Sequence, residues 1–427
     1  MNLTFLVTVT QMTIAYIDPG SGSVLISVLV AALAIAFYYL RSFFYEKARY
    51  IFKRQNPLHK ESYGLVFYTE GSHYWPVFLP VIRELDHRGF TFTYFTSEGD
   101  DPALKAEFVN MNSIYIGKDH QAYFVLNRLH ADMVIMTTPG LGVLQLKRSK
   151  KVRHYCHIVH SLQDTSTYPP YGLDYYDSVL VSGKDQLDII RQLEKARKRP
   201  EKNIRIIGST YLDFMREELE QSQSGLINLD KDKKTVLLAP SWGDKGFLNK
   251  FGERIINRLL KAGYQVIIRP HPQSWKSEAE VLKKIQDTFG DHSTVIWDYK
   301  PHGLEAMQHA DLLISDLSGV IFDYMFLFNK PVIVTELEID PRKFDMNSLP
   351  SKRSTLMELI NEGKIGYQLK EAEFESVAEV VNEVINSKQD TVHINEIKDR
   401  IYSYPEEAGK RGADFILEIY KSLIYDK

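Results

Sequence analysis

The sequence predicts an α/β protein with two Rossmann-like domains. From residue 64 onward, short apolar runs alternate with amphipathic segments of helical length, which is typical of repeated βαβ units. A polar stretch over residues 212–234 interrupts the alternation, and the pattern restarts at Thr235. In this second cycle, two apolar runs end in clusters of charged and hydroxyl side chains, where an open parallel sheet binds its ligands. We therefore expect a ligand site in the second domain.

The first domain is predicted to span residues 61–211. Apolar residues recur at helical spacing over residues 75–87 and 184–195. The expected strands are the short runs rich in β-branched and aromatic residues, at 65–69, 91–96, 113–116, 133–137, 155–159, 178–182 and 204–207.

The second domain is predicted to span residues 235–375, with helices over 248–261 and 278–289. Its expected strands lie at residues 235–239, 265–268, 295–297, 312–315 and 332–334. Residues 376–427 are predicted to form C-terminal helices, over 377–385 and 399–424, with an interruption at Pro405.

Residues 1–60 are predicted to form a membrane anchor. Residues 1–40 contain a single charge, Asp18, and residues 24–40 are an uncharged apolar run of nearly membrane-spanning length. The flank that follows is basic, so the positive-inside rule places it on the cytoplasmic side of the cell membrane. A cleaved signal peptide is the alternative, but no Lys or Arg precedes the apolar run. We expect a single-pass protein with its catalytic domains in the cytoplasm.

Composition argues against several classes of protein. The formal net charge of -3 provides no general attraction for nucleic acid. Cys156 is the single cysteine, which excludes an internal disulfide framework. His154, His157 and His160 would alternate faces in a strand, so their spacing does not predict a metal site. We expect neither a metal nor a cofactor.

The first functional cluster follows the strand predicted at residues 265–268. Arg269 and His271 are each followed by a proline, and these prolines end the strand and stiffen the turn. Both polar side chains are therefore expected to project from a strand end.

The second cluster follows the strand predicted at residues 312–315. Asp316, Ser318 and Gly319 stand where a helix is expected to begin, and this helix would continue past Asp323. Asp316 and Ser318 could serve only as a helix cap. However, a helix N-terminus also attracts anions, and parallel strands end at one edge of the sheet. We expect the two clusters to bind one nucleotide diphosphate.

Three segments together resemble a known family. These are APSWG at residues 239–243, RPHP at 269–272 and SDLSGVIFDY at 315–324, and in order and spacing they resemble the CDP-glycerol glycerophosphotransferases. The resemblance is strongest over residues 235–334. Enzymes of that family are membrane-associated and build teichoic-acid-like polymers. Two Rossmann-like domains that face a cleft are also the GT-B-like architecture of two-domain glycosyltransferases.

The resemblance implies roles for individual residues. Those implied to surround the donor are Arg269, His271, Asp316, Ser318, Gly319 and Asp323, with Trp242 and Lys245 from the first segment. His160 is the counterpart of a proposed base histidine in a W-H-G element, and His271 and Asp316 complete the catalytic candidates.

The chain departs from the family pattern at four positions. Val159 and Ser161 flank His160 in place of Trp and Gly, Gly243 replaces an Arg, and Gly319 replaces the second Ser of the D-x-S-S segment. The change at Gly319 removes one hydroxyl contact from the implied site and the change at Gly243 removes one charge contact, although Lys245 could reach the same region.

The implied activity is transfer of glycerol phosphate, or of a similar polyol phosphate, from a CDP-activated donor. The acceptor would be a hydroxyl of a lipid-linked or polymeric glycan, and CMP would be released. Independently, phosphoryl transfer needs positive and dipolar groups at the phosphate oxygens, and a neutral histidine suits the base role. Alternatives are a nucleotide-sugar glycosyltransferase or UDP-sugar 2-epimerase on the same fold, or a non-catalytic membrane scaffold.

Overall fold

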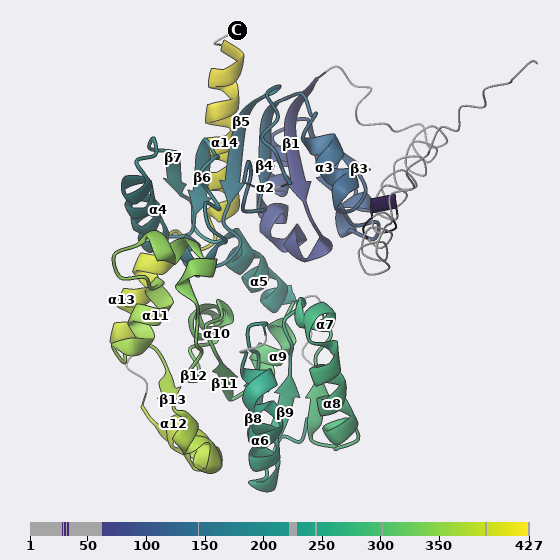
Figure 1. Ribbon diagram of the computed structural model, residues 1–427. Coiled ribbons are helices and arrows are strands. Elements are labelled where there is room, and N and C mark those ends of the chain that lie inside the picture. Colours follow the sequence, from purple (N-terminus) through teal and green to yellow (C-terminus); the bar gives the residue numbers. More distant parts are fainter. Residues whose placement is uncertain are drawn as a thin grey trace, which may run out of the picture. The chain divides into compact units, whose positions relative to one another are not determined.

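Two parallel β-sheets organise the part of the chain that the structure describes (Figure 1). The computed structural model describes residues 62–143, 145–221, 229–243, 246–300, 302–388 and 391–425, together with Val28, Val30, Ala32 and Leu33. Residues 60–427 belong to one compact unit that contains both sheets. We call the first sheet with its helices the N-lobe and the second sheet with its helices the C-lobe.

The N-lobe sheet has the strand order β3-β2-β1-β4-β5-β6-β7, and all its pairings are parallel. Its strands are β1 (Tyr63–Thr69), β2 (Phe92–Thr96), β3 (Met111–Tyr115), β4 (Ala131–Met136), β5 (Val152–Ile158), β6 (Ser178–Val181) and β7 (Asn203–Ile206). The accompanying helices are α2 (Trp75–His87), α3 (His120–Leu126), α4 (Lys184–Arg197) and α5 (Thr210–Gln221).

The C-lobe sheet repeats this topology with the order β10-β9-β8-β11-β12-β13, again fully parallel. Its strands are β8 (Thr235–Leu238), β9 (Gln265–Ile268), β10 (Val295–Trp297), β11 (Leu312–Ser315), β12 (Val332–Thr335) and β13 (Tyr367–Leu369). Its helices are α6 (Phe247–Lys261), α7 (Ser274–Ser277), α8 (Ala279–Phe289), α9 (Leu304–His309), α10 (Val320–Phe328) and α11 (Thr355–Asn361).

The prediction of two parallel α/β units is confirmed, and most of the expected strands agree within one to three residues. The polar connection expected from residue 212 instead begins with helix α5, whose buried residues include Leu212, Phe214 and Met215. The acidic run after these residues concealed the helix, because three buried positions are too few to dominate the pattern.

The C-terminal helices are divided between the lobes. Helix α12 (Val377–Asn386) packs into the C-lobe core through Val377 and Val381, and α13 (Thr391–Ile401) follows it. Helix α14 (Ala408–Tyr425) returns to the N-lobe and lies along α2 (Figure 1). At their contact, a Cβ built on Gly409 would lie 2.7 Å from the carbonyl oxygen of Pro80, so only glycine allows this approach.

The predicted membrane-spanning run, residues 24–40, lies outside the described residues except at the four positions named above, which are helical. Across the described part of the chain, no helix combines the length and the apolar character that a membrane crossing requires.

Candidate functional site

The carboxyl ends of β8, β9 and β11 form the edge of the C-lobe sheet where the candidate site lies. Leu238 of β8 is in register with Ile268 of β9 on one side and with Ile314 of β11 on the other. The loops after β9 and β11 therefore leave the sheet at the same edge, about 10 Å apart at two strand spacings. Because β8 and β11 flank the point where strand order reverses, this edge is the expected binding position in such a sheet.

Arg269 follows β9 and is held in place by the next strand. One guanidinium nitrogen, Nη1, donates to Asp298 Oδ2 at 2.7 Å and to the carbonyl of Lys300 at 2.9 Å. Gly303 lies against the guanidinium, since a Cβ built there would be 2.7 Å from Arg269 Nε. The Arg269 side chain is largely buried, so its positive charge is fixed beside the strand edge.

Asp316 follows β11 and lies fully buried. Its Oδ1 accepts from the backbone N–H of Ser241 at 2.7 Å, and its Oδ2 accepts from that of Phe247 at 3.4 Å. Burial raises the pKa of Asp316, and the two backbone donors oppose that shift. Both carboxylate oxygens thus fix the loop between β8 and α6, so Asp316 acts on the site by positioning this loop.

The β8–α6 loop carries the predicted residues Trp242 and Lys245. The Trp242 side chain is 53% exposed, and its ring lies 6.4 Å from that of His271. Gly243 has φ of 121°, a conformation that L side chains rarely adopt, which explains glycine where an Arg was expected. Lys245 lies outside the described residues.

Helix α10 begins at the same edge. Gly319 is its N-cap residue, and no side chain caps the helix. Ser318 donates its backbone N–H to the carbonyl of Asp316 at 2.8 Å, which turns the chain into the helix. The N–H groups of Ile321 and Phe322 donate to the carbonyls of Ser318 and Gly319, so those of Gly319 and Val320 remain available among the described residues, an arrangement suited to an anion.

Asp323 lies in the first turn of α10, and its carboxylate differs from that of Asp316 in its hydrogen-bond partners. No hydrogen bond or ion pair to its carboxylate is present among the described residues. Burial alone raises the pKa of Asp323 to about 7. Burial is the largest cause of the raised pKa of Tyr211 in α5, and both charges influence it, because Asp323 raises this pKa and Arg269 lowers it.

His271 lies close to Arg269 in the turn after β9. Its Nδ1 accepts from the backbone N–H of Gln273 at 3.1 Å, so in the neutral ring Nε2 carries the hydrogen. Burial, with smaller contributions from His73 and Arg269, lowers the pKa of His271 to about 4. At neutral pH the imidazole is therefore an uncharged hydrogen-bond donor.

His160 follows β5 of the N-lobe. Its ring stacks on Tyr168 at 5.9 Å and meets the edge of Tyr74 at 5.0 Å. Burial is the largest cause that lowers its pKa to about 4, and His73 and His271 add to this shift. A backbone hydrogen bond with Thr137 opposes the shift, while the buried Nδ1 has no partner in the described residues. His160 is thus neutral and has one unused nitrogen.

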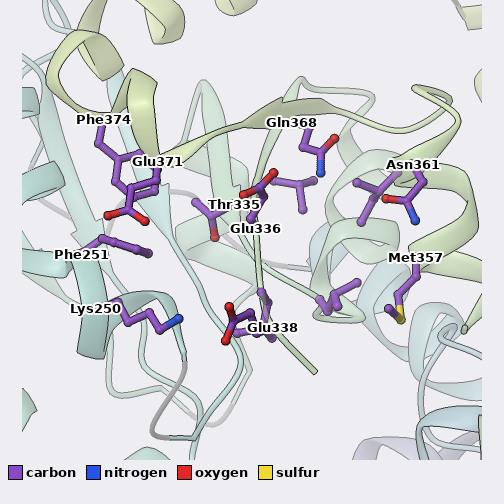
Figure 2. A pocket seen from close by; sticks show the side chains of 14 residues that line it. Lys250, Phe251, Thr335, Glu336, Glu338, Met357, Asn361, Gln368, Glu371 and Phe374 are labelled. Atoms are coloured by element: carbon purple, nitrogen blue, oxygen red, sulfur yellow. The ribbon is translucent and has the colours of Figure 1, made fainter. Parts of the chain in front are cut away.

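A cavity of about 290 Å³ adjoins this edge of the C-lobe (Figure 2). It lies between α6, the loop after β12, α11 and β13, and Leu317, next to Asp316, is part of its wall. Its charged and amide side chains are Lys250, Glu336, Glu338, Asn361, Gln368 and Glu371, and Phe251 and Phe374 provide aromatic surface. Three carboxylates against one lysine favour a neutral, hydroxyl-rich group over a phosphate.

A family model matches residues 115–404, and its description is CDP-Glycerol:Poly(glycerophosphate) glycerophosphotransferase. The chain belongs to this family. The match includes most of both sheets, and it extends the resemblance seen in residues 235–334 into the N-lobe. The chain is therefore an enzyme of the CDP-glycerol glycerophosphotransferase family.

Solved structures with the same fold include the wall teichoic acid polymerase TagF, with 17% sequence identity and a TM-score of 0.57 over 93% of this chain and 97% of that chain. The UDP-GlcNAc 2-epimerase from Neisseria meningitidis has 15% identity and a TM-score of 0.54 over 83% and 100% of the two chains. The Methanocaldococcus jannaschii epimerase has 14% identity and a TM-score of 0.53 over 83% and 99%. These similarities show a GT-B-like fold. No curated protein sequence matches the chain.

His73 is a third imidazole near the candidate site, and sequence reasoning missed it. It lies in the short helix η2 (Ser72–Tyr74) after β1 and acts electrostatically on both His160 and His271. The turn is fixed by Glu98, whose Oε2 accepts from the Ser72 N–H at 2.6 Å. Burial lowers the pKa of His73, Glu98 opposes that shift, and Lys276 reinforces it. The available signal was a Gly-Ser-His turn directly after a buried strand.

The loop that carries His160 is tethered to the C-lobe. Asp164 Oδ1 accepts from the Ser166 N–H at 2.9 Å, and its Oδ2 accepts from the backbone N–H of Thr355 at the start of α11. Further along the same loop, the carbonyl of Tyr168 accepts from the Asp345 N–H at 2.8 Å. The loop therefore has a fixed position relative to the C-lobe sheet.

A buried ion pair joins the lobes near this loop. The guanidinium of Arg197, at the end of α4, binds the carboxylates of Asp174 and Asp345. Asp345 also accepts from the backbone N–H groups of Tyr171 and Gly172, which satisfies both of its oxygens. Removal of Arg197 would leave two buried carboxylates without their shared cation, a costly arrangement.

Proposed function

We propose that this enzyme transfers glycerol phosphate, or a similar polyol phosphate, from a CDP-activated donor to an acceptor hydroxyl. The single observation that carries the proposal is the convergence of Arg269, His271 and the uncapped start of α10 at one edge of the C-lobe sheet. A diphosphate placed there would face a fixed guanidinium, a neutral N–H donor and the positive end of a helix dipole.

The cavity supports a nucleoside donor. Its volume of about 290 Å³ is near the lower end of ligand pockets, which hold about 300–1,000 Å³. Ribose hydroxyls can donate to Glu336, Glu338 or Glu371, and an amide such as Gln368 can pair with the polar edge of a base. Because Leu317 connects the cavity wall to the start of α10, one molecule could place its nucleoside in the cavity and its phosphates at the helix.

The proposed reaction is an in-line displacement at the phosphorus that carries the polyol. The acceptor oxygen forms a bond to that phosphorus, the bond from phosphorus to the bridging oxygen breaks, and CMP leaves with the bridging oxygen and its electron pair. The acceptor proton passes to His160, whose unused nitrogen is Nδ1. Since Tyr74 and Tyr168 cover the ring, the acceptor hydroxyl must replace one of these contacts.

His271 and Asp323 serve the donor in this proposal. His271 donates its Nε2 hydrogen to an oxygen of the leaving phosphate, because its Nδ1 is occupied by Gln273. Bound phosphate charge would raise the pKa of either imidazole, which favours protonation of His160 during transfer. Asp323, with a pKa of about 7, can hold a proton and donate it to a phosphate oxygen instead of repelling that oxygen.

The finer parts of the proposal concern the acceptor and the membrane. We propose a lipid-linked or polymeric glycan as acceptor and a single-pass anchor in residues 1–60, with the catalytic lobes in the cytoplasm. The basic flank after the apolar run supports this, because it favours anionic headgroups on that side. An enzyme confined to the membrane surface meets a lipid-linked acceptor at high effective concentration.

The test is to incubate the full-length protein with CDP-glycerol, CDP-ribitol or UDP-GlcNAc in the presence of a glycan acceptor linked to a lipid. CMP release from a CDP-polyol, with phosphodiester formed on the acceptor, is the expected result. Release of UDP, or epimerisation of UDP-GlcNAc, would assign the site to nucleotide-sugar chemistry instead. His160→Gln is the matched negative control, and His87→Gln, at the exposed end of α2, controls for loss of a histidine in general.

A further inference from the structure

Ser161 of the N-lobe and Gly319 of the C-lobe are in direct contact. A Cβ atom built on Gly319 would lie 2.4 Å from Ser161 Oγ, a distance that real atoms do not tolerate. The same Cβ would lie 3.7 Å from Ser161 Cβ, which is ordinary van der Waals contact. The Ser161 hydroxyl, in the orientation that the Gln163 N–H holds, therefore leaves room only for glycine at position 319.

The two residues are departures from the family pattern that complement each other. The pattern predicts Gly at position 161 and Ser at position 319, and this chain has Ser and Gly. Serines at both positions would collide unless one side chain turned away, whereas a single serine at either position leaves room for one hydroxyl at this point of contact. The chain thus keeps one hydroxyl there but provides it from the opposite lobe.

The surroundings of Ser161 Oγ are those of the proposed phosphate site. Gly319 is the uncapped N-cap residue of α10, and Ser161 directly follows His160, whose buried Nδ1 is unpartnered among the described residues. The hydroxyl is held by the Gln163 N–H, which donates to Oγ at 3.2 Å. The Ser161 carbonyl accepts from Gln186 Nε2 at 2.8 Å, which fixes the backbone as well.

We infer that Ser161 is a donor-binding residue, whose hydroxyl hydrogen is donated to a phosphate oxygen of the donor at the start of α10. Since Oγ already accepts from Gln163, its own hydrogen is available for an anion, which the helix dipole attracts to this place. The inference rests on the proposed function for the identity of the donor. It adds that a hydroxyl of the N-lobe completes the phosphate site of the C-lobe.

The experiment compares Ser161→Ala, Gly319→Ser and the double variant in the full-length protein. Ser422→Ala, on the exposed face of α14, and Gly99→Ser, where an added Cβ meets nothing within 4 Å, are the matched controls. Affinity for inorganic pyrophosphate is measured by calorimetry, and CMP release from CDP-glycerol is measured in parallel.

Ser161→Ala is expected to weaken pyrophosphate binding and to lower kcat/KM by about tenfold to a hundredfold, as for a lost hydrogen bond to a charged group. Gly319→Ser alone is expected to lose at least as much, because its side chain meets Ser161 Oγ. The double variant is expected to return to within about fivefold of the wild type, because serine at 319 then restores the hydroxyl and alanine at 161 makes room for it.

The inference is overturned if Ser161→Ala binds pyrophosphate as the wild type does, or if the double variant is no better than Ser161→Ala. A merely structural role for Ser161 would not be rescued by moving the hydroxyl to the other lobe. Failure of the proposed function has a different signature. In that case CDP-glycerol gives no CMP with the wild type, while the pattern of loss and rescue in pyrophosphate affinity still decides the role of Ser161.

Discussion

The two sheet edges that contribute to the site differ in how well their polar groups are satisfied. At the C-lobe edge, Arg269 is paired with Asp298, and Asp316 accepts two backbone N–H groups. At the N-lobe edge, His160 has a buried nitrogen without a partner in the described residues. The C-lobe edge is thus already arranged to hold a charged ligand, whereas the N-lobe edge keeps a group that can take up a proton.

The contrast divides two tasks between the lobes. The C-lobe edge holds fixed charges, and the N-lobe edge holds groups that can change their charge. Buried charges are tolerated in the C-lobe because each has a fixed partner, and the resulting field is ready before the donor binds. The N-lobe imidazoles are kept neutral by burial, so they can change charge during the reaction. Asp323 is the exception, since it is a C-lobe carboxyl without a partner in the described chain.

The largest effect is expected from removal of the unpartnered imidazole. His160→Gln should lower kcat by about 10²- to 10⁴-fold, the usual contribution of a general base, and should leave the donor Kd nearly unchanged. Single-turnover kinetics with CDP-glycerol, together with calorimetry, separates the two quantities. If the donor Kd rose by as large a factor as kcat fell, His160 would be a donor-binding residue. The two sheet edges would then no longer differ in their tasks.

The second-largest effect is expected at the C-lobe edge, where the charged side chains have partners. Arg269→Ala should weaken donor binding by about tenfold to a hundredfold and also reduce stability by about 2–4 kcal/mol, because Asp298 remains buried without its partner. Adding Asp298→Asn should recover most of the free energy of unfolding but none of the donor affinity. If the double variant recovered both the stability and the donor affinity, Arg269 would serve only the packing of its loop.

Asp323 should reveal itself through the pH dependence of stability. Its pKa is raised in the folded protein, so its favourable contribution is complete below the unfolded pKa near 4 and is lost as pH rises through about 7. Asp323→Asn should therefore stabilise the protein at pH 8 by about 1–4 kcal/mol relative to its effect at pH 4. Urea unfolding at both pH values measures this. If Asp323→Asn changed the free energy of unfolding equally at pH 8 and pH 4, the Asp323 carboxylate would be paired in solution.

The smallest effect is expected at Trp242, which is half exposed beside His271. Trp242→Phe should change kcat/KM less than about threefold, and Trp242→Ala less than about tenfold, since an exposed ring buries little area. Steady-state kinetics with both variants is sufficient. A larger loss in Trp242→Ala that phenylalanine restores would show that the ring stacks on the ligand.

The placement of the two C-lobe clusters at one sheet edge could be predicted from sequence because its signals are local. Each cluster directly follows a buried strand, and proline or a capping residue marks the turn, so strand order alone brings Arg269 and Asp316 to one edge. The roles within the cluster were less predictable. Asp316 and Asp323 lie on one short segment, yet only coordinates show that one is satisfied by backbone N–H groups and the other is not.

The features missed by sequence reasoning depend on contacts between distant segments. His73 lies in a turn of ordinary composition, and the cavity residues Glu336 and Gln368 belong to an exposed loop and a three-residue strand. Ser161 and Gly319 each stood out as a departure from the family pattern, but their contact joins two lobes and could not be read from the sequence. Helix α5 was missed because its few buried positions precede an acidic run.

The tether between Asp164 and Thr355 has a further consequence. A hinge motion that separated the two sheets would have to break this bond and the bond from the Asp345 N–H to the Tyr168 carbonyl. If the bonds held, the motion would move His160 relative to the N-lobe sheet. As long as both bonds hold, the loop that carries His160 stays with the C-lobe when the sheets move.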